Sequence, residues 1–411
     1  MNYQSITSEF NSKPWVVSTV CIMIAGISFG FGVYLLPMVI PEMATDLQLN
    51  YTLIGIITGV GQVSTILSIP LAGFLTGRIG GLKLLVGIQL IGGLFLLGLY
   101  FVSGFFSFLI FNFLIRAWPI MTWIPLVSIA VEHIPYKWRA TMLIIASGAT
   151  CFFVFIDGLI SSFFLEYFHW RTMWLAVAAI CLISSLLSWI ALKSVGSWQV
   201  TVCRHDQERN QSRSELIVWL KSSSGIILNV IFMLTGLSFM TFQVYLASYL
   251  RDELNVGLDT IALMWSSMGI SGIFGGIFFG LITDRIGVRI SQFFIFAFGI
   301  IATFLMCFSV SPLYLIMMAI LFGISQATIY GMGPAYISKV LSGESARNAF
   351  IIGSMIMSFG GLFGNFIVGW SHGIFGTFWW SYVAIGVIFA FGALLSLLLV
   401  SEKRHHLGSS L

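Results

Sequence analysis

Two similar octets decide the fold of this 411-residue chain. The first reads Gly73-Phe-Leu-Thr-Gly-Arg-Ile-Gly80, and the second reads Gly280-Leu-Ile-Thr-Asp-Arg-Ile-Gly287, 207 residues further along. Each octet closes the second long apolar stretch of its half of the chain. Two arginines repeat at nearly the same spacing as the octets, since Arg139 and Arg347 lie 208 residues apart. An internal repeat of this kind predicts a protein built from two similar halves.

The composition places both halves in a membrane. The chain is 58% hydrophobic and only 8% charged, whereas a soluble domain carries about 25% charged residues. Stretches long enough to cross a hydrocarbon core of ~30 Å favour helices over the ~10-residue strands of a barrel. Twelve such stretches are expected, at 15–40, 51–76, 84–103, 105–131, 139–165, 172–192, 225–250, 258–282, 290–309, 312–338, 346–370 and 377–400. The sequence therefore predicts an all-α integral membrane protein with twelve transmembrane helices in two pseudo-symmetric six-helix bundles.

A polar segment at 194–223 separates the first six stretches from the last six. We expect an N-terminal bundle at 1–193, a cytoplasmic linker at 194–223 and a C-terminal bundle at 224–411. When the stretches are threaded alternately, sixteen of the nineteen basic residues fall on one side, with Arg171 and Arg251 on the other and Arg116 inside. Since basic loops stay in the cytoplasm, both termini are expected there, in a bacterial inner membrane.

Two charged residues stand inside apolar stretches. Arg116 lies in the fourth and Asp157 in the fifth. An ion at the bilayer centre costs ~3 kcal/mol unless it is paired or faces water. Counting along the helices puts both at ~12–16 Å from the same membrane face, so we expect them to meet. Two interpretations are open: a buried structural ion pair, or an arginine that binds an anionic substrate group beside an aspartate that takes up a proton. Asn365 occupies the matching position of the second half.

The octets resemble the signature of the major facilitator superfamily, Gly-x-Leu-x-Asp-Arg-x-Gly-x-Arg/Lys. The second-half copy, Gly280 to Arg289, matches closely, whereas the first-half copy has Gly77 in place of the aspartate. Arg116 resembles an arginine that the family places in span four. The resemblance covers the whole chain and implies a secondary active transporter that works by alternating access. The antiporter signature Gly-Pro-x-x-Gly-Gly is absent from the fifth stretch.

The residues of the octets and nearby arginines are candidates for a gate. Gly73 and Gly77 share one helix face and allow a neighbouring backbone to approach. A carboxylate beside an arginine at the membrane rim can bind a helix end or an opposing charge. The alternative is plain anchoring at the membrane interface. The candidate gating residues are Gly73, Gly77, Arg78, Asp284, Arg285, Arg289, Arg139 and Arg347.

The resemblance also implies that spans one, four, seven and ten line a central cavity. The candidate substrate-binding residues are Arg116, Tyr34, Asn112, Trp123, Gln243, Tyr245, Gln326, Tyr330 and Asn365, and Asp157 is the candidate for proton coupling. For each of them a packing role is the alternative. Glycines and prolines in span one (Gly30, Gly32, Pro37, Pro41) and span ten (Gly331, Gly333, Pro334) predict helices that bend.

The expected function is proton-coupled symport of a small organic solute, anionic or zwitterionic because Arg116 has no second basic partner. The alternative is a proton-coupled exporter of amphipathic drugs or metabolites. An enzyme is not expected, because the six histidines lie in loops, at span edges or in the tail, without a catalytic constellation. A non-transporting receptor would leave Arg116 without a use. We expect a monomer in the lipid bilayer whose partners are its solute and protons, with no cofactor, metal or nucleic acid.

Overall fold

The computed structural model describes residues 14–194, 209–341 and 343–400, and helices make up almost all of them. The first half contains α1 (Pro14–Phe29), η1 (Gly30–Tyr34), α2 (Leu35–Asp46), α3 (Tyr51–Ile79), α4 (Gly81–Tyr100), α5 (Phe105–His133), α6 (Tyr136–Tyr167) and α7 (Trp170–Ser194). The second half contains α9 (Ser223–Thr235), η2 (Gly236–Met240), α10 (Thr241–Ser248), η3 (Tyr249–Glu253), α11 (Leu258–Ile286), α12 (Val288–Phe308), α13 (Pro312–Val340), α14 (Gly343–Phe375) and α15 (Trp379–Leu398). The η segments are π-helical turns.

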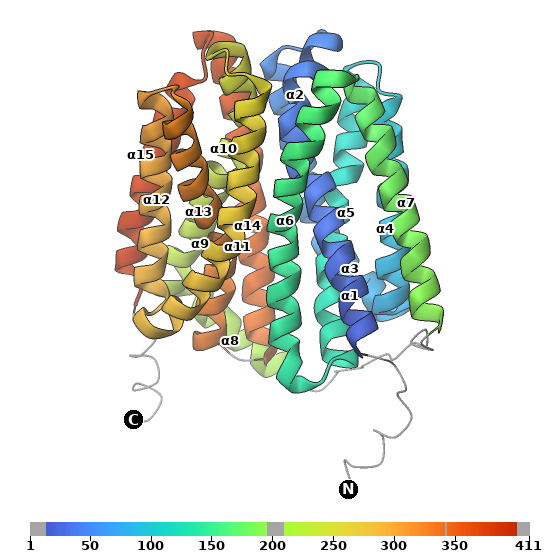
Figure 1. Cartoon of the computed structure of the whole chain (residues 1–411). Helices are drawn as coiled ribbons and strands as arrows, with labels where there is room; N and C mark the ends of the chain where they lie inside the picture. Colours follow the sequence, from blue (N-terminus) through green and yellow to red (C-terminus); the bar gives the residue numbers. More distant parts are fainter. Residues whose placement is uncertain (1–13, 195–208, 342, 401–411) are drawn as a thin grey trace, which may run out of the picture.

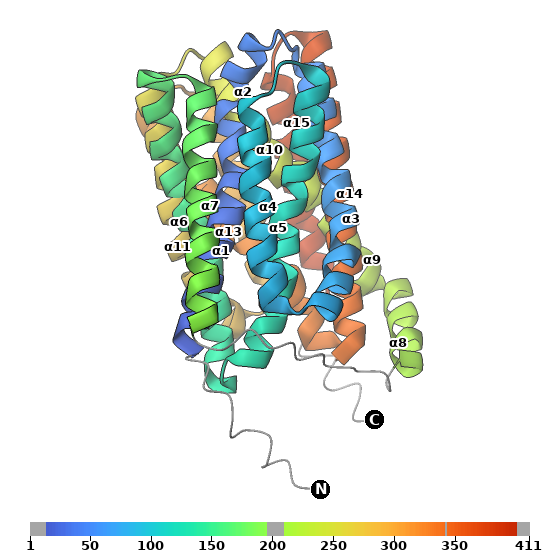
Figure 2. The ribbon, with the colours of Figure 1, turned by 90° about the vertical axis from the view of Figure 1, so that its right-hand side faces the viewer.

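The described residues form twelve helical spans that are long and apolar enough to cross a membrane, which confirms the predicted fold. The first span runs through α1, η1 and α2, and the seventh runs through α9, η2, α10 and η3. Helices α1–α7 gather on one side of the molecule and α9–α15 on the other (Figure 1). We call the end at which α1 begins and α15 finishes the lower end. A short helix, α8 (Arg209–Lys221), lies at the lower end within the predicted linker (Figure 2); residues 195–208 of that linker are outside the described part.

The last glycine of each octet ends its helix. Gly80 follows α3 with φ 91° and Gly287 follows α11 with φ 89°. Residues other than glycine rarely adopt such angles. A single chain conformation thus explains why both octets finish in glycine. The next helix, α4 or α12, starts directly from this turn.

A π-helical segment interrupts the first helix of each half. Gly30–Tyr34 widens the first span, and Gly236–Met240 widens the seventh at nearly the matching position. Single π turns inside α-helices occur frequently at functional sites. The irregularity predicted for span one is therefore present, whereas span ten remains one α-helix, α13, with Pro334 inside it.

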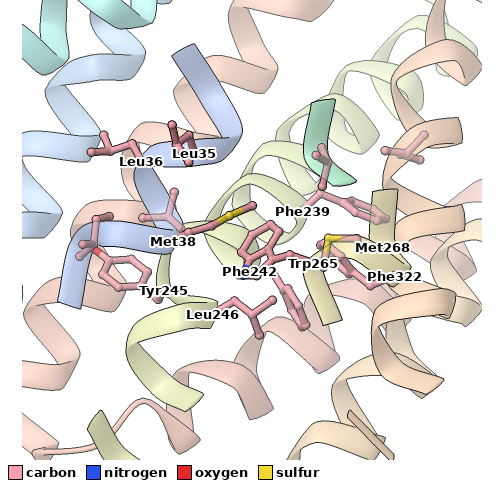
Figure 3. Close-up of a cluster of buried hydrophobic side chains, with 14 of the residues drawn as sticks. Leu35, Leu36, Met38, Phe239, Phe242, Tyr245, Leu246, Trp265, Met268 and Phe322 are labelled. Atoms are coloured by element: carbon pink, nitrogen blue, oxygen red, sulfur yellow. The ribbon is translucent and has the colours of Figure 1, made fainter. Parts of the chain in front are cut away.

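The two halves pack closely in the middle and upper parts of the bundle. Helix α3 packs on α14, α6 on α11 and α2 on α10. A Cβ on Gly369 would lie 2.4 Å from the Tyr51 carbonyl oxygen, and one on Gly269 would lie 2.4 Å from the Phe155 amide nitrogen. Only glycine fits at contacts this short. Between them, apolar side chains of α2 such as Met38 face those of α10 (Figure 3).

Toward the lower end these helices have room. A Cβ on Gly73 or Gly77 of α3, or on Gly276 or Gly280 of α11, would meet nothing within 4 Å. The close glycine contacts between the halves therefore stop above the two octets. Close glycine contacts therefore join the halves in the middle and upper parts of the bundle.

Candidate functional site

The Arg116 side chain is buried in the middle of α5, with 6% of its surface exposed. It packs against Gly61 of α3, where a Cβ would lie 2.9 Å from the arginine Cγ. One turn earlier, Asn112 donates from Nδ2 to the carbonyl oxygen of Ile57 at 2.7 Å. Glycine at position 61 thus makes room for two polar side chains of α5. The Nε of Arg116 has no hydrogen-bond partner among the described residues.

Two tyrosines from opposite halves lie within electrostatic range of Arg116. The guanidinium interacts electrostatically with the phenol groups of Tyr34, at the end of η1, and Tyr330, on α13. Both tyrosines are predicted site residues, and the structure brings them to the arginine. Arg116 therefore lies at the boundary between the two halves, where a change in their relative position alters its surroundings.

A pair of glutamines continues this polar group into the second half. Gln326 of α13 donates from Nε2 to Oε1 of Gln243 on α10, and it also interacts with the hydroxyl group of Tyr330. The Nε2 of Gln243 is buried and has no partner among the described residues. Together with Nε of Arg116, it is a buried donor that a bound acceptor could satisfy.

Asp157 is fully buried on α6, and neither of its carboxylate oxygens has a hydrogen-bond partner in the described part of the chain. The expected direct contact with Arg116 is therefore not formed. Residue counting gives the depth of a side chain but not the direction in which its helix turns it. Asp157 instead interacts electrostatically with Cys181 of α7 and with Tyr34. Tyr34 thus lies within electrostatic range of both charged residues.

Three other predicted residues lie away from Arg116. Tyr245 donates its hydroxyl to the carbonyl oxygen of Asn365 at 2.6 Å, in the upper contact between α3 and α14. The amide atoms of Asn365 are buried without a described partner. Trp123 lies about two helical turns below Arg116 on α5 and packs edge-on against Phe29 at 5.9 Å between ring centroids. Tyr245 and Asn365 therefore belong to the contact between the halves.

Three of the candidate gating residues contact groups of their own half of the chain. Arg78 lies over the ring of Phe74, one turn earlier in α3, at 4.8 Å. Arg347 pairs with Glu344 of its own helix at 3.5 Å, and Arg139 donates to the carbonyl oxygen of Ile134 at 3.0 Å. Arg285 is exposed and Arg289 is partly buried, whereas the side chain of Asp284 lies outside the described part. A Cβ on Gly73 or Gly77 would meet nothing within 4 Å, so no close helix contact forms at these two glycines.

The sequence analysis missed the contacts that close the upper end. Glu42 of α2 forms an ion pair with Arg251 of η3, and the hydroxyl of Tyr51 on α3 donates to Asp252. Both contacts join the first half to the second. A signal was available, because Glu42 and Arg251 are 209 residues apart and carry opposite charges at matching ends of the first helix of each half.

Twelve spans in two similar halves, with a buried polar centre between them, define a transporter of small solutes. The model of the Major Facilitator Superfamily matches residues 22–217 and 228–410. The chain belongs to this family, and the family resemblance of the two octets is confirmed.

Relatives and solved structures agree with this assignment. The cis,cis-muconate transport protein of Acinetobacter baylyi is 22% identical over 295 residues, which are 68% of either chain. A bacterial homologue of the human lysosomal transporter Spinster, solved in an inward-facing and unoccupied conformation, has a TM-score of 0.75 and 15% identity, over 97% of this chain and 98% of that one. A variant of the nucleoside transporter NupG has a TM-score of 0.74 and 13% identity, over 94% and 100%.

Proposed function

We propose that this chain transports a small organic anion by alternating access and that Asp157 carries a coupled proton. The observation that carries the proposal is the position of Arg116, a buried cation that interacts electrostatically with tyrosines from both halves of the molecule. An anion bound there would interact with both halves at once. Its binding could then favour a change in their relative position, as alternating access requires.

The neighbouring polar groups favour one charge on the bound end of the solute. An arginine can hold a carboxylate through two parallel hydrogen bonds. The Nε of Arg116 and the Nε2 of Gln243 are buried donors without described partners, so both are available to oxygen atoms of a solute. The amides of Gln243 and Gln326 suit a neutral polar group or the far end of a longer acid. A carboxylic acid also accords with the muconate relative, whereas the exporter alternative has no comparable support.

The proton is assigned to Asp157 because its carboxyl group is buried and has no described partner. A carboxyl group of this kind can bind and release a proton, because no ion pair holds it in its ionised form. Tyr34 interacts electrostatically with Asp157 and with Arg116. An anion bound at Arg116 would change the electrostatic surroundings of Tyr34, and a shift of Tyr34 with its π-helical turn would in turn change those of Asp157. This linkage replaces the direct ion pair as the proposed means of coupling.

The test is uptake into proteoliposomes of the purified protein. The solutes are cis,cis-muconate, a panel of monocarboxylates and the matching neutral amides, with and without a pH gradient. Acids should accumulate and amides should not. Arg116→Gln should reduce uptake at low solute about 30-fold or more, since a buried charged hydrogen bond is lost, and Arg116→Lys should be intermediate. Lys221→Gln, which removes an exposed cation on α8, is the matched control.

Asp157→Asn separates binding from coupling in the same vesicles. It should retain exchange of solute across the membrane and lose accumulation driven by the pH gradient. Asn365→Asp makes the reverse exchange at the matching position of the second half and shows what the same change of side chain does away from Asp157. Equal uptake of acids and amides would refute the anion site, and proton-driven accumulation that survives in Asp157→Asn would refute the proton assignment.

A further inference from the structure

The upper end of the molecule contains an aromatic socket that holds one side chain of the other half. Tyr51, at the first turn of α3, lies against His372 of α14 at 4.7 Å and against Phe378 at 4.8 Å between ring centroids. The rings of His372 and Phe378 are themselves 4.2 Å apart. The hydroxyl of Tyr51 donates to Asp252 of η3. We call His372, Phe378 and Asp252 the Tyr51 socket.

Glu253 holds two members of the socket through its carboxylate. Its carboxylate accepts hydrogen bonds from the hydroxyl of Thr377 and from the amide of Phe378, both at 2.6 Å. The same carboxylate lies 3.4 Å from Nε2 of His372, and only 17% and 21% of these two side chains are exposed. Because Phe378 and His372 are both held by Glu253, the position of the socket depends on this one carboxylate.

We propose that His372 is a proton-binding site at the upper end and that its protonation holds the two halves together there. Histidine is the side chain that ordinarily changes its charge between pH 5 and 8. Protonated His372 forms an ion pair with Glu253 and presents a cation to the ring of Tyr51, an attraction that neutral imidazole lacks. Acid therefore stabilises the closed upper end, and a rise in pH releases Tyr51.

The charges around His372 favour this direction. Two carboxylates lie at the socket, Glu253 beside His372 and Asp252 at the hydroxyl of Tyr51, both from η3, and Tyr51 supplies an aromatic ring from α3. The cation of the same segment, Arg251, is engaged with Glu42 across the halves. A proton on His372 therefore adds a positive charge where negative charge and a ring already converge. The site lies at the upper end of α14, whereas Asp157 lies in the middle of α6, so the two are separate sites.

The experiment measures the opening of the upper end by the distance between two spin labels. Ser103 and Val310 are exposed, occupy matching short turns of the two halves, and serve as cysteine positions for labelling. The labelled protein carries Glu42→Gln, which removes the ion pair to Arg251 and raises the open fraction to a measurable level. Distances are recorded in nanodiscs at about pH 7.5 and about pH 5.5, either side of the range in which histidine changes charge.

The open fraction should fall about threefold on acidification, the effect of one partly exposed contact between a cation and a ring. His372→Gln should show the same open fraction at both pH values, and Glu253→Gln should weaken the response. His169→Gln is the matched control, because His169 is exposed at the same end and its ring accepts a hydrogen bond from the nearby amide of Arg171 in its own half. An open fraction that does not change with pH in the parent, or that still falls in His372→Gln, would overturn the proposal. A response lost equally in His169→Gln would do the same.

Discussion

The upper and lower ends of the bundle are held in different ways. At the upper end the halves are joined by the ion pair of Glu42 with Arg251 and by the socket around Tyr51. At the lower end Arg78 and Arg347 contact only their own helices among the interactions described. The residues that close this conformation thus lie outside the signature by which the family is identified. The signature residues lie at the lower end, below these contacts, and we expect them to bind across the halves when the lower end closes.

The largest effect should come from a larger side chain at Gly369, where α14 packs closely on α3. Gly369→Leu would place a Cβ 2.4 Å from the Tyr51 carbonyl oxygen and 2.8 Å from the Cα of Gly55. Because both neighbours are backbone, α3 and α14 must separate, at a cost of about 3 kcal/mol by analogy with overpacked cores. The labels at Ser103 and Val310 should report a predominantly open upper end.

Gly73→Leu provides the control for added bulk. It changes a glycine of the same helix, α3, at a position where a Cβ meets nothing within 4 Å. This variant should keep the parent distance distribution and elute as a folded protein. If Gly369→Leu remains folded and closed, the glycine contact does not hold the upper end together.

The next effect in size concerns the ion pair across the upper end. Glu42 and Arg251 expose 18% and 24% of their side chains. Loss of either charge should favour opening by about 2 kcal/mol, between the values for exposed and fully buried pairs. Glu42→Gln and Arg251→Gln should give similar open fractions with the same labels.

The exchanged pair, Glu42→Arg with Arg251→Glu, tests whether the interaction itself matters. It should restore most of the closed fraction, and the double neutral variant should open no further than either single one. If the effects of the two neutral substitutions are additive, each residue acts through other partners. The upper end would then be held by the Tyr51 socket and the close glycine contacts.

Most of the fold could be predicted from the sequence. The repeat of the octets and the twelve apolar stretches specify two similar halves, because span length and repeat spacing are properties of the chain alone. The glycines of span one predicted the irregular turn at Gly30–Tyr34, whereas α13, for which the same argument predicted a bend or break, runs as one continuous α-helix. A glycine or proline shows where a helix can deform, and neighbouring helices decide whether it does.

The site could be predicted only in part. Tyr34, Tyr330 and Arg116 were each named as candidates from the sequence, and in the structure both tyrosines interact electrostatically with the arginine. The pairing of Arg116 with Asp157 was wrong for this conformation, since equal depth does not fix the direction of a side chain. Glu42 and Arg251 were missed because charged residues at the ends of spans are common, and only their matching positions in the repeat distinguish them.

The smallest effect should come from restoring the missing carboxylate of the first octet. Gly77→Asp places an acidic side chain at the lower end of α3, where the second octet has Asp284. It should favour closure of the lower end by about 0.5 kcal/mol, the contribution of a single exposed charge near a helix end or an opposing cation. Spin labels at the exposed lower-end residues Ser194 and Ser338 should show a shorter mean distance.

Gly77→Asn has the same size without the charge and should leave that distance unchanged. The upper labels should respond in the opposite sense to the lower ones, because a transporter that works by alternating access opens one end as it closes the other. A lower end that closes while the upper end stays shut would show that the two ends are independent, and the contrast between them would then describe two separate gates instead of one coupled movement.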